Sequence, residues 1–284
     1  GSWEGMRERS TFSRIATLAS ADQRAGDFSA YRTNIYDPMT GLADGRERIP
    51  FPGAVIPTIR HSAITRRLQA LAPLPNLSGP ANNFFASAPT VFNRDNYDAK
   101  INYNLSPATT FWGKVAVMDA RVQSQYNLGE AGGQGMINGG GAGVGKVRAH
   151  VITLAGTHLL RPNFLIDGNL SFSHDPLDLV HSDSGRNLGL ELLGIPGTNG
   201  PDVRQSGLPI FNINGYENYG NPYSYMPKYV NDNSITIAVN AGWQKGAHDI
   251  RFGLDMTRAT LNHWHPEVGN NGPRGRFSFT GGSS

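Results

Sequence analysis

The chain has 284 residues, of which 38% are hydrophobic and only 17% are charged, while glycine (35 residues) and proline (18 residues) are plentiful. This balance favours strands, turns and long loops over helices, so we expect an all-β protein. The net charge of +3, with scattered basic residues, predicts no nucleic-acid surface, and the absence of cysteine excludes disulfides, thiolate metal sites and a cysteine nucleophile. No apolar run approaches the ~18 residues of a spanning helix, and the N-terminus lacks the features of a signal peptide.

The first part of the chain lacks the regular alternation that marks a strand. It is rich in proline, glycine, asparagine and aspartate, with a short helix expected over Ser62 to Leu71 and a partial strand over Trp3 to Met6. We therefore predict a long structured loop over residues 10–95, followed by β-hairpins with long loops over residues 96–284.

Three pairs of segments in the second part alternate with period two, which is typical of strands whose faces meet different environments. Tight turns join the pairs at Ser106-Pro107-Ala108, Arg161-Pro162-Asn163 and Gln244-Lys245-Gly246-Ala247, whereas long polar stretches, Val122 to Val147 and Asp175 to Asp232, separate them. The paired segments are Asn96–Ser106 with Thr109–Arg121, Ile152–Thr157 with Phe164–Ser173, and Ile235–Trp243 with His248–Met256. Strands of about 9–11 residues, with short turns on one side and long loops on the other, indicate a transmembrane β-barrel.

The two faces of these strands have different predicted surroundings. A lysine or arginine facing lipid at the midplane would cost about 2–4 kcal/mol, so the polar face should line the lumen. The polar-face residues are Asp98, Lys100, Lys114, Asp167, Arg251 and Asp255. Aromatic residues near strand ends predict an interfacial girdle, although aromatics also simply favour strands. These are Tyr97, Tyr103, Trp112, Phe172, Trp243 and Phe252.

One short motif is a candidate metal site. The spacing in His263-Trp264-His265 puts both imidazoles on one face of a strand, and Glu267 could add an oxygen ligand. The alternative is an extracellular loop just past the third hairpin, which we favour because no further ligand cluster is evident. We therefore predict no metal site, with His263 and His265 as the only weak candidates.

Two other segments contain residues that are typical of binding or catalytic sites. The glycine-rich run Gly129 to Gly145 could suggest a phosphate cradle, but such a loop needs an adjoining helix and this run leads back into a strand, so we expect a flexible loop. Asp175, Asp178, His181 and Asp183 lie close in sequence, and we interpret them as solvated loop charges. We expect no catalytic residue, no cofactor and no enzyme activity.

An ordered set of motifs resembles Oar-like TonB-dependent receptors, large outer-membrane proteins common in acidobacteria and related groups. The motifs run through nearly the whole chain, and the set is specific although its single elements are weak. They are Ser2-Trp3-Glu4-Gly5, Arg24-Ala25-Gly26-Asp27-Phe28-Ser29, Ile35-Tyr36-Asp37-Pro38-Met39-Thr40-Gly41, Pro50-Phe51-Pro52-Gly53 with Val55-Ile56-Pro57, Leu74-Pro75-Asn76 with Asn82-Asn83-Phe84, the strand from Asp95 to Asn104, Leu193-Gly194-Ile195-Pro196-Gly197, Gly207-Leu208-Pro209, and the hairpin from Gly246 to Asp255.

The resemblance implies that residues 1–284 form part of one receptor barrel domain in the outer membrane of a Gram-negative bacterium. A plug domain, a carboxypeptidase-regulatory-like domain and a TonB-contacting segment would lie elsewhere in a longer protein, and the cut-looking ends Gly1-Ser2-Trp3 and Gly281-Gly282-Ser283-Ser284 agree with that expectation. The implied partners are outer-membrane lipid, the plug, the TonB complex and a scarce ligand such as a siderophore, glycan or peptide.

Our leading hypothesis is therefore an energy-coupled receptor and transporter whose ligand-facing loops are Thr11 to Arg94, Val122 to Val147 and Asp175 to Asp232. With roughly eight strands, counting partial ones at Trp3–Met6 and Arg276–Thr280, we expect an open curved sheet rather than a small closed barrel. The alternatives are a surface or adhesion barrel without transport, and a secreted soluble β-sandwich that binds or hydrolyses carbohydrate.

Overall fold

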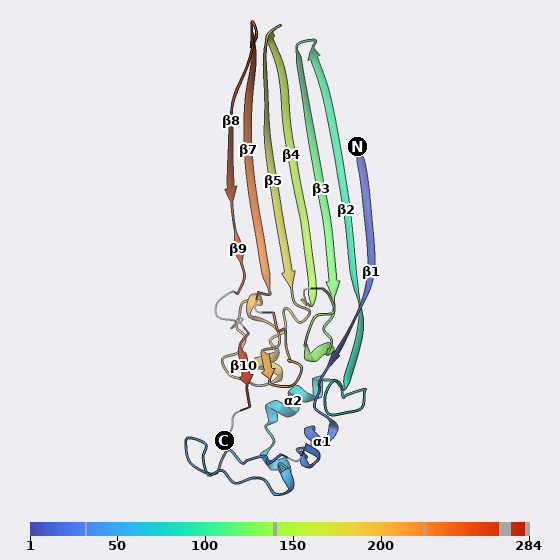
Figure 1. The fold of residues 1–284 in the computed structure, drawn as a ribbon, viewed down its shortest axis with the longest axis vertical. Helices are drawn as coiled ribbons and strands as arrows, with labels where there is room; N and C mark the ends of the chain where they lie inside the picture. Colours follow the sequence, from blue (N-terminus) through green and yellow to red (C-terminus); the bar gives the residue numbers. More distant parts are fainter. Residues whose placement is uncertain (32, 139–140, 224, 267–273, 282–284) are drawn as a thin grey trace.

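Long antiparallel strands dominate the structure, a computed structural model that describes residues 1–31, 33–138, 141–223, 225–266 and 274–281 (Figure 1). One sheet contains eight strands in the order β1-β2-β3-β4-β5-β7-β8, with β9 pairing with β7. The strands are β1 (Ser2–Ala16), β2 (Phe84–Ser106), β3 (Thr109–Ser124), β4 (Gly143–Arg161), β5 (Phe164–Val180), β7 (Lys228–Lys245), β8 (His248–Thr260) and β9 (His263–Trp264). Within the described residues β1 and β8 do not pair, so the predicted open sheet is confirmed.

All three predicted hairpins are present. Antiparallel pairing joins β2 to β3, β4 to β5 and β7 to β8 across short turns, and these turns lie together at the upper end of Figure 1. The long connections gather at the lower end. The predicted asymmetry of short turns and long loops is therefore confirmed.

An uncovered apolar face runs across the sheet near the tight turns. Leu154 pairs with Leu170, Leu170 with Ile237, and Ile237 with Met256, so one register row is apolar across four strands. These four side chains stay 37–59% exposed. Other members of this face are Ile101, Tyr103, Phe111, Val115, Ile152, Phe172, Val239, Phe252 and Leu254.

The opposite face is polar, and ion pairs and hydrogen bonds connect neighbouring strands there. The Lys114 ammonium lies 2.8 Å from the Asp98 carboxylate, and the Asn240 amide donates to Asp167 at 3.0 Å. Lys100, Arg251 and Asp255 occupy the same face by register. Trp112 also lies on this face, opposite Asn102 and 4.4 Å below the Lys100 ammonium, so its prediction as a girdle residue is wrong.

The strands continue beyond the apolar face, which corrects the predicted loop over residues 10–95. β1 runs to Ala16 and pairs in register with the first part of β2, Phe84–Asp98. Polar contacts hold this extension, including an Arg7–Asp95 ion pair at 2.7 Å. One face of the extension meets water, and the other contacts the glycine-rich run, where Arg14 donates to the Gly135 carbonyl at 3.0 Å and Thr90 is buried. These contacts are largely polar, so the sequence there carries no apolar alternation and gave no strand signal.

The other two predicted loops are also shorter than expected, for the same reason. β3 continues to Ser124 and β4 begins at Gly143, while β5 continues to Val180 and β7 begins at Lys228. Asp175 and Asp178 therefore lie on β5 rather than in a loop.

The long connections fold together into one body at the lower end of the sheet, here called the loop assembly (Figure 1). Its described residues are 17–31, 33–83, 125–138, 141–142, 181–223, 225–227 and 274–281. Its regular elements are α1 (Ala21–Arg24), α2 (Ala63–Leu71), the parallel pair β6 (Ile210–Ile213) and β10 (Arg276–Phe279), and the single turns η1 (Ser29–Tyr31), η2 (Pro52–Ala54), η3 (Thr58–Arg60), η4 (Gly129–Ala131), η5 (Leu188–Leu192) and η6 (Val203–Gln205). Helix α2 confirms the predicted helix. The strand expected at Arg276–Thr280 belongs to this body and not to the large sheet, because its register partner is β6.

The hydrophobic core of the chain lies in the loop assembly. Leu18, Leu128, Leu193 and Leu208 are at most 2% exposed, and they come from three different connections. Each connection therefore buries its few apolar residues against the others. Among the described residues, no helix has the length and hydropathy needed to cross a membrane.

The glycine-rich run is packed rather than open, which corrects the expectation of a flexible loop. Ala131 and Met136 are fully buried. Gly132 has φ +85°, and a Cβ there would lie 2.5 Å from the Gly220 carbonyl oxygen. Glycine is required because two backbones meet at this point.

Candidate ligand-binding site

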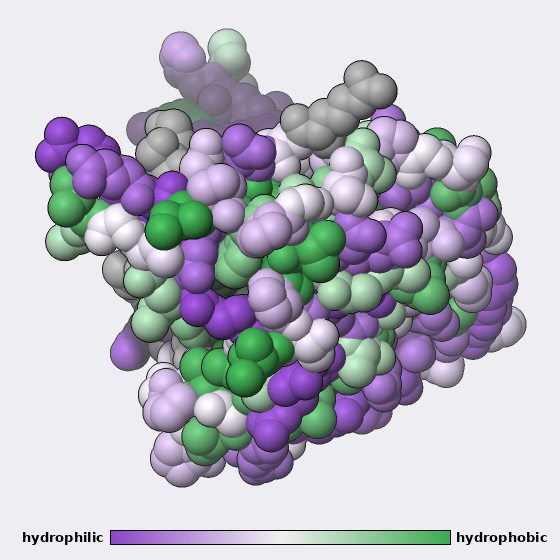
Figure 2. All heavy atoms as spheres, turned by 90° about the horizontal axis from the view of Figure 1, so that it is seen from below, coloured by the Kyte–Doolittle hydropathy of each residue, from purple (hydrophilic) through white to green (hydrophobic). Residues whose placement is uncertain are grey.

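A pocket of about 580 Å³ opens in the loop assembly between α1, α2 and the β6–β10 pair. This volume is within the ~300–1,000 Å³ typical of small-molecule sites. The lining residues are Ala19, Gln23, Phe28, Ser62, Ile64, Thr65, Leu68, Gln69, Ile195, Phe211, Ile213, Tyr216, Tyr219, Phe277 and Phe279. Figure 2 looks onto this end of the molecule and shows hydrophobic side chains in groups among hydrophilic ones.

Aromatic rings form one wall of the pocket. Phe211 on β6 and Phe277 on β10 stack with ring centroids 5.2 Å apart and planes at 17°. Phe211 and Tyr219 are about 5% exposed or less, so the rings are held by packing. Burial raises the pKa of Tyr219, which keeps its hydroxyl neutral.

One polar group in the pocket has a fixed orientation. Ser20 and Gln23 form a capping box at the start of α1, in which the Gln23 side-chain oxygen accepts from the Ser20 amide at 2.9 Å. The Gln23 Nε2 then donates to the Tyr216 hydroxyl at 2.6 Å. Since that oxygen already accepts a hydrogen bond, the Tyr216 proton remains available to a ligand.

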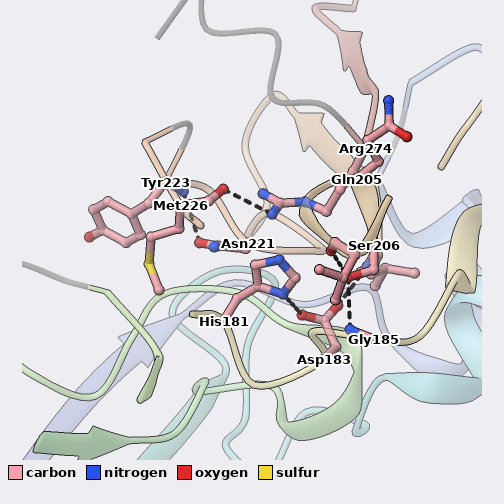
Figure 3. A network of polar contacts seen from close by, with 12 residues as sticks. His181, Asp183, Gly185, Gln205, Ser206, Asn221, Tyr223, Met226 and Arg274 are labelled. Atoms are coloured by element: carbon pink, nitrogen blue, oxygen red, sulfur yellow. Dashed lines mark hydrogen bonds and ion pairs between the residues drawn. The ribbon is translucent and has the colours of Figure 1, made fainter. Parts of the chain in front are cut away.

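A second polar feature, the buried cluster in Figure 3, stabilises the loop assembly. The His181 Nδ1 lies 2.7 Å from the Asp183 carboxylate, which also accepts from the Leu208 amide at 2.5 Å. The Arg274 side chain, fully buried, donates to the Met226 carbonyl at 3.1 Å. The expectation that His181 and Asp183 are solvated is therefore wrong, since the His181 side chain is 0% exposed and that of Asp183 is 12% exposed. Sequence alone could not show this, because the connection around them was expected to be open.

Burial lowers the pKa of His181, and the nearby Arg274 charge lowers it further, although Asp183 opposes both. The unfolded chain thus takes up a proton at higher pH than the folded protein does. We expect the loop assembly to be fully stabilised by this group above about pH 6.5 and to lose stability as the pH falls below it toward the folded pKa. Amide hydrogen exchange from pH 7 to 5 measures this loss; His181→Gln should flatten the dependence, and an unchanged profile in that variant would rule out His181 as its source.

The candidate metal residues are only partly brought together. His263 on β9 donates through Nε2 to the Asp232 carboxylate at 2.7 Å, and His265 follows two residues later. Glu267 lies outside the described residues. In the part of the chain that is described, no group of three or more histidine, aspartate or glutamate side chains is arranged to hold a metal ion.

The pocket itself was not anticipated from the sequence. Its lining comes from segments almost 200 residues apart, such as Gln23 and Tyr216, which are 193 residues apart in the chain. The motif residues Leu193 and Leu208, which we noted only for their resemblance to a receptor family, turn out to be core residues beneath it. The sequence did contain one signal for the pocket: these connections carry several apolar residues of the kind that are usually buried.

Comparison with known proteins identifies the family of the chain. No curated protein and no solved structure matches it. Residues 1–284 match the family described as outer membrane beta barrel domain. This match and the uncovered apolar face of the large sheet overturn the alternative of a secreted soluble β-sandwich. The chain therefore belongs to the outer membrane beta barrel domain family, and its place is the cell outer membrane.

Proposed function

We propose that the protein is an energy-coupled outer-membrane receptor and transporter of the TonB-dependent type. The observation that carries this proposal is the loop assembly: three long connections form one packed body with a pocket of about 580 Å³. Binding function tends to lie in loops that a rigid scaffold holds in place. A barrel that only organises the surface has no need of such a pocket.

The two ends of the sheet support an orientation for this receptor. Outer-membrane barrels have short periplasmic turns and long extracellular loops. The hairpin turns of β2–β3, β4–β5 and β7–β8 would then face the periplasm, and the loop assembly would face the exterior. The apolar face contacts lipid, whereas the face with Asp98 and Lys114 faces the lumen, where a plug domain of the same protein would bind.

The test is direct binding of TonB. The intact protein, purified in detergent, is mixed with the purified periplasmic domain of TonB from the same organism, and complex formation is measured by size-exclusion chromatography and calorimetry. We expect a complex with a dissociation constant on the order of micromolar, about −8 kcal/mol. A general porin from the same membrane is the matched control and should not bind.

Failure to bind TonB under conditions in which the protein keeps its heat-modifiable migration on a detergent gel would contradict the proposal. That result would favour the adhesion or surface-organising alternative. Heat-modifiable migration is the folding control, since it reports a closed barrel independently of any partner.

A further inference from the structure

We infer that the pocket of the loop assembly takes an uncharged, predominantly apolar ligand that offers a hydrogen-bond acceptor to the Tyr216 hydroxyl. This inference deepens the proposed function, on which it rests, by naming the chemical class of the ligand. Siderophores, glycans and peptides all fit a receptor, and the wall of the pocket distinguishes among them.

Charge is the first discriminating property. No lysine, arginine, histidine, aspartate or glutamate is among the described lining residues. The basic side chain of α1, Arg24, already has partners at the end of α2. Its Nη1 donates to the Gln69 carbonyl at 3.1 Å and to the Ala72 carbonyl at 2.9 Å. A charged ligand would therefore lose its hydration without gaining a partner of opposite charge, which is strongly unfavourable.

Hydrogen-bonding capacity is the second property. A glycan buries many hydroxyl groups, each of which needs a partner. The most buried apolar lining residues are instead Leu68, Phe211 and Tyr219. The polar lining away from the exposed rim consists of the oriented Gln23–Tyr216 pair, the half-buried Gln69 and the Tyr219 hydroxyl. The polar side chains of Ser62 and Thr65 are exposed and so belong to the mouth. This distribution suits an apolar or aromatic body with one polar group rather than a sugar.

The geometry of the aromatic wall agrees with a flat apolar group. The Phe211 and Phe277 rings stack on each other with planes at 17°, and Phe277 is the more exposed ring of the pair. Aromatic groups prefer offset-stacked or edge-on contact with such rings. The expected ligand is thus an aromatic or apolar molecule, or the apolar end of a neutral peptide.

The test uses two photoreactive probes that share a skeleton and differ in charge. Benzophenone-4-carboxamide is neutral and carries a carbonyl acceptor, whereas benzophenone-4-carboxylate is anionic. Each is irradiated with the intact protein in outer-membrane vesicles, and the labelled peptides are identified by mass spectrometry. We expect the amide to label segments 62–69 and 210–219 at least about tenfold more than the carboxylate. Localised labelling separates the pocket from nonspecific uptake of the probe by lipid.

A matched pair of variants tests whether the pocket is the site. Ala19 lines the pocket, whereas Ala21, two residues later, is exposed and does not. Ala19→Trp should fill the cavity and reduce labelling by the amide about tenfold or more, while Ala21→Trp should leave it unchanged. Heat-modifiable migration verifies that both variants fold.

Two results would overturn the inference: equal labelling by the carboxylate, and labelling by the amide that Ala19→Trp does not reduce. The TonB experiment separates these from failure of the proposed function. Binding of TonB without selective labelling would leave the receptor intact and refute the ligand class. Selective labelling without TonB binding would support the ligand class and refute energy-coupled transport.

Discussion

Replacement of Leu170 by arginine should destabilise the intact protein in a bilayer by about 2–4 kcal/mol. Leu170 lies in the middle of the apolar face, between Leu154 on β4 and Ile237 on β7, and its side chain is 47% exposed. In a water-soluble protein such an exposed position would tolerate the change within about 0.5 kcal/mol. The large loss expected here comes from placing a guanidinium in hydrocarbon. Equilibrium unfolding in urea from lipid vesicles measures it.

The neighbouring residue provides the control. Asn169 lies on the opposite face, beside Ala155 and Ala238, so arginine there would point into the hydrated lumen. We expect Asn169→Arg to change the free energy of unfolding by about 0.5 kcal/mol or less. Similar losses for the two variants would refute the assignment of lipid and lumen faces.

The substitution Asp183→Asn should destabilise the loop assembly by about 3–5 kcal/mol. Asparagine keeps the shape and can still accept from the Leu208 amide. It removes the negative charge that compensates the fully buried Arg274, so a buried cation is left uncompensated. We expect the loss of stability to be confined to the loop assembly, because the Asp183 carboxylate makes its contacts there. Hydrogen exchange in residues 181–227 at pH 7 measures it.

An exposed ion pair in the same connection is the matched control. Asp202 contacts Arg204, and both side chains are more than a third exposed. Solvent screens surface pairs of this kind, so Asp202→Asn should have little effect on stability. If both variants raised exchange equally, the special role of the buried carboxylate would be refuted.

The barrel wall could be predicted from the sequence because a bilayer imposes a regular pattern on it. Between Ile235 and Trp243, for example, every second side chain faces hydrocarbon and the intervening ones face water, and the alternation marks both the strand and its faces. The tight turns were equally visible. The extension of β1 and β2 was missed because its contacts are polar, such as the Arg7–Asp95 ion pair and the hydrogen bond from Arg14 to the Gly135 carbonyl, so no apolar alternation is imposed.

The loop assembly and its pocket could not be predicted, for a different reason. Their formation depends on contacts between residues far apart in the chain, such as Gln23 with Tyr216, and local patterns contain no information about these contacts. His181 was taken for a solvated group because its neighbours in sequence are polar. Its burial is produced by Gly207 and Arg274, which a single segment does not reveal.

The strand extensions determine how far the loop assembly lies from the membrane. The part of β2 from Phe84 to Asn96 lies beyond the apolar face. At about 3.3 Å per residue it spans about 40 Å, or about 30 Å above the lipid after a tilt of about 45°. The strand extensions therefore hold the pocket above the lipid at a height similar to the thickness of the hydrocarbon layer. Under the proposed function, a molecule captured there would come from the external medium rather than from the membrane surface, and it would then have to move the full length of the strand extensions before it reached the bilayer.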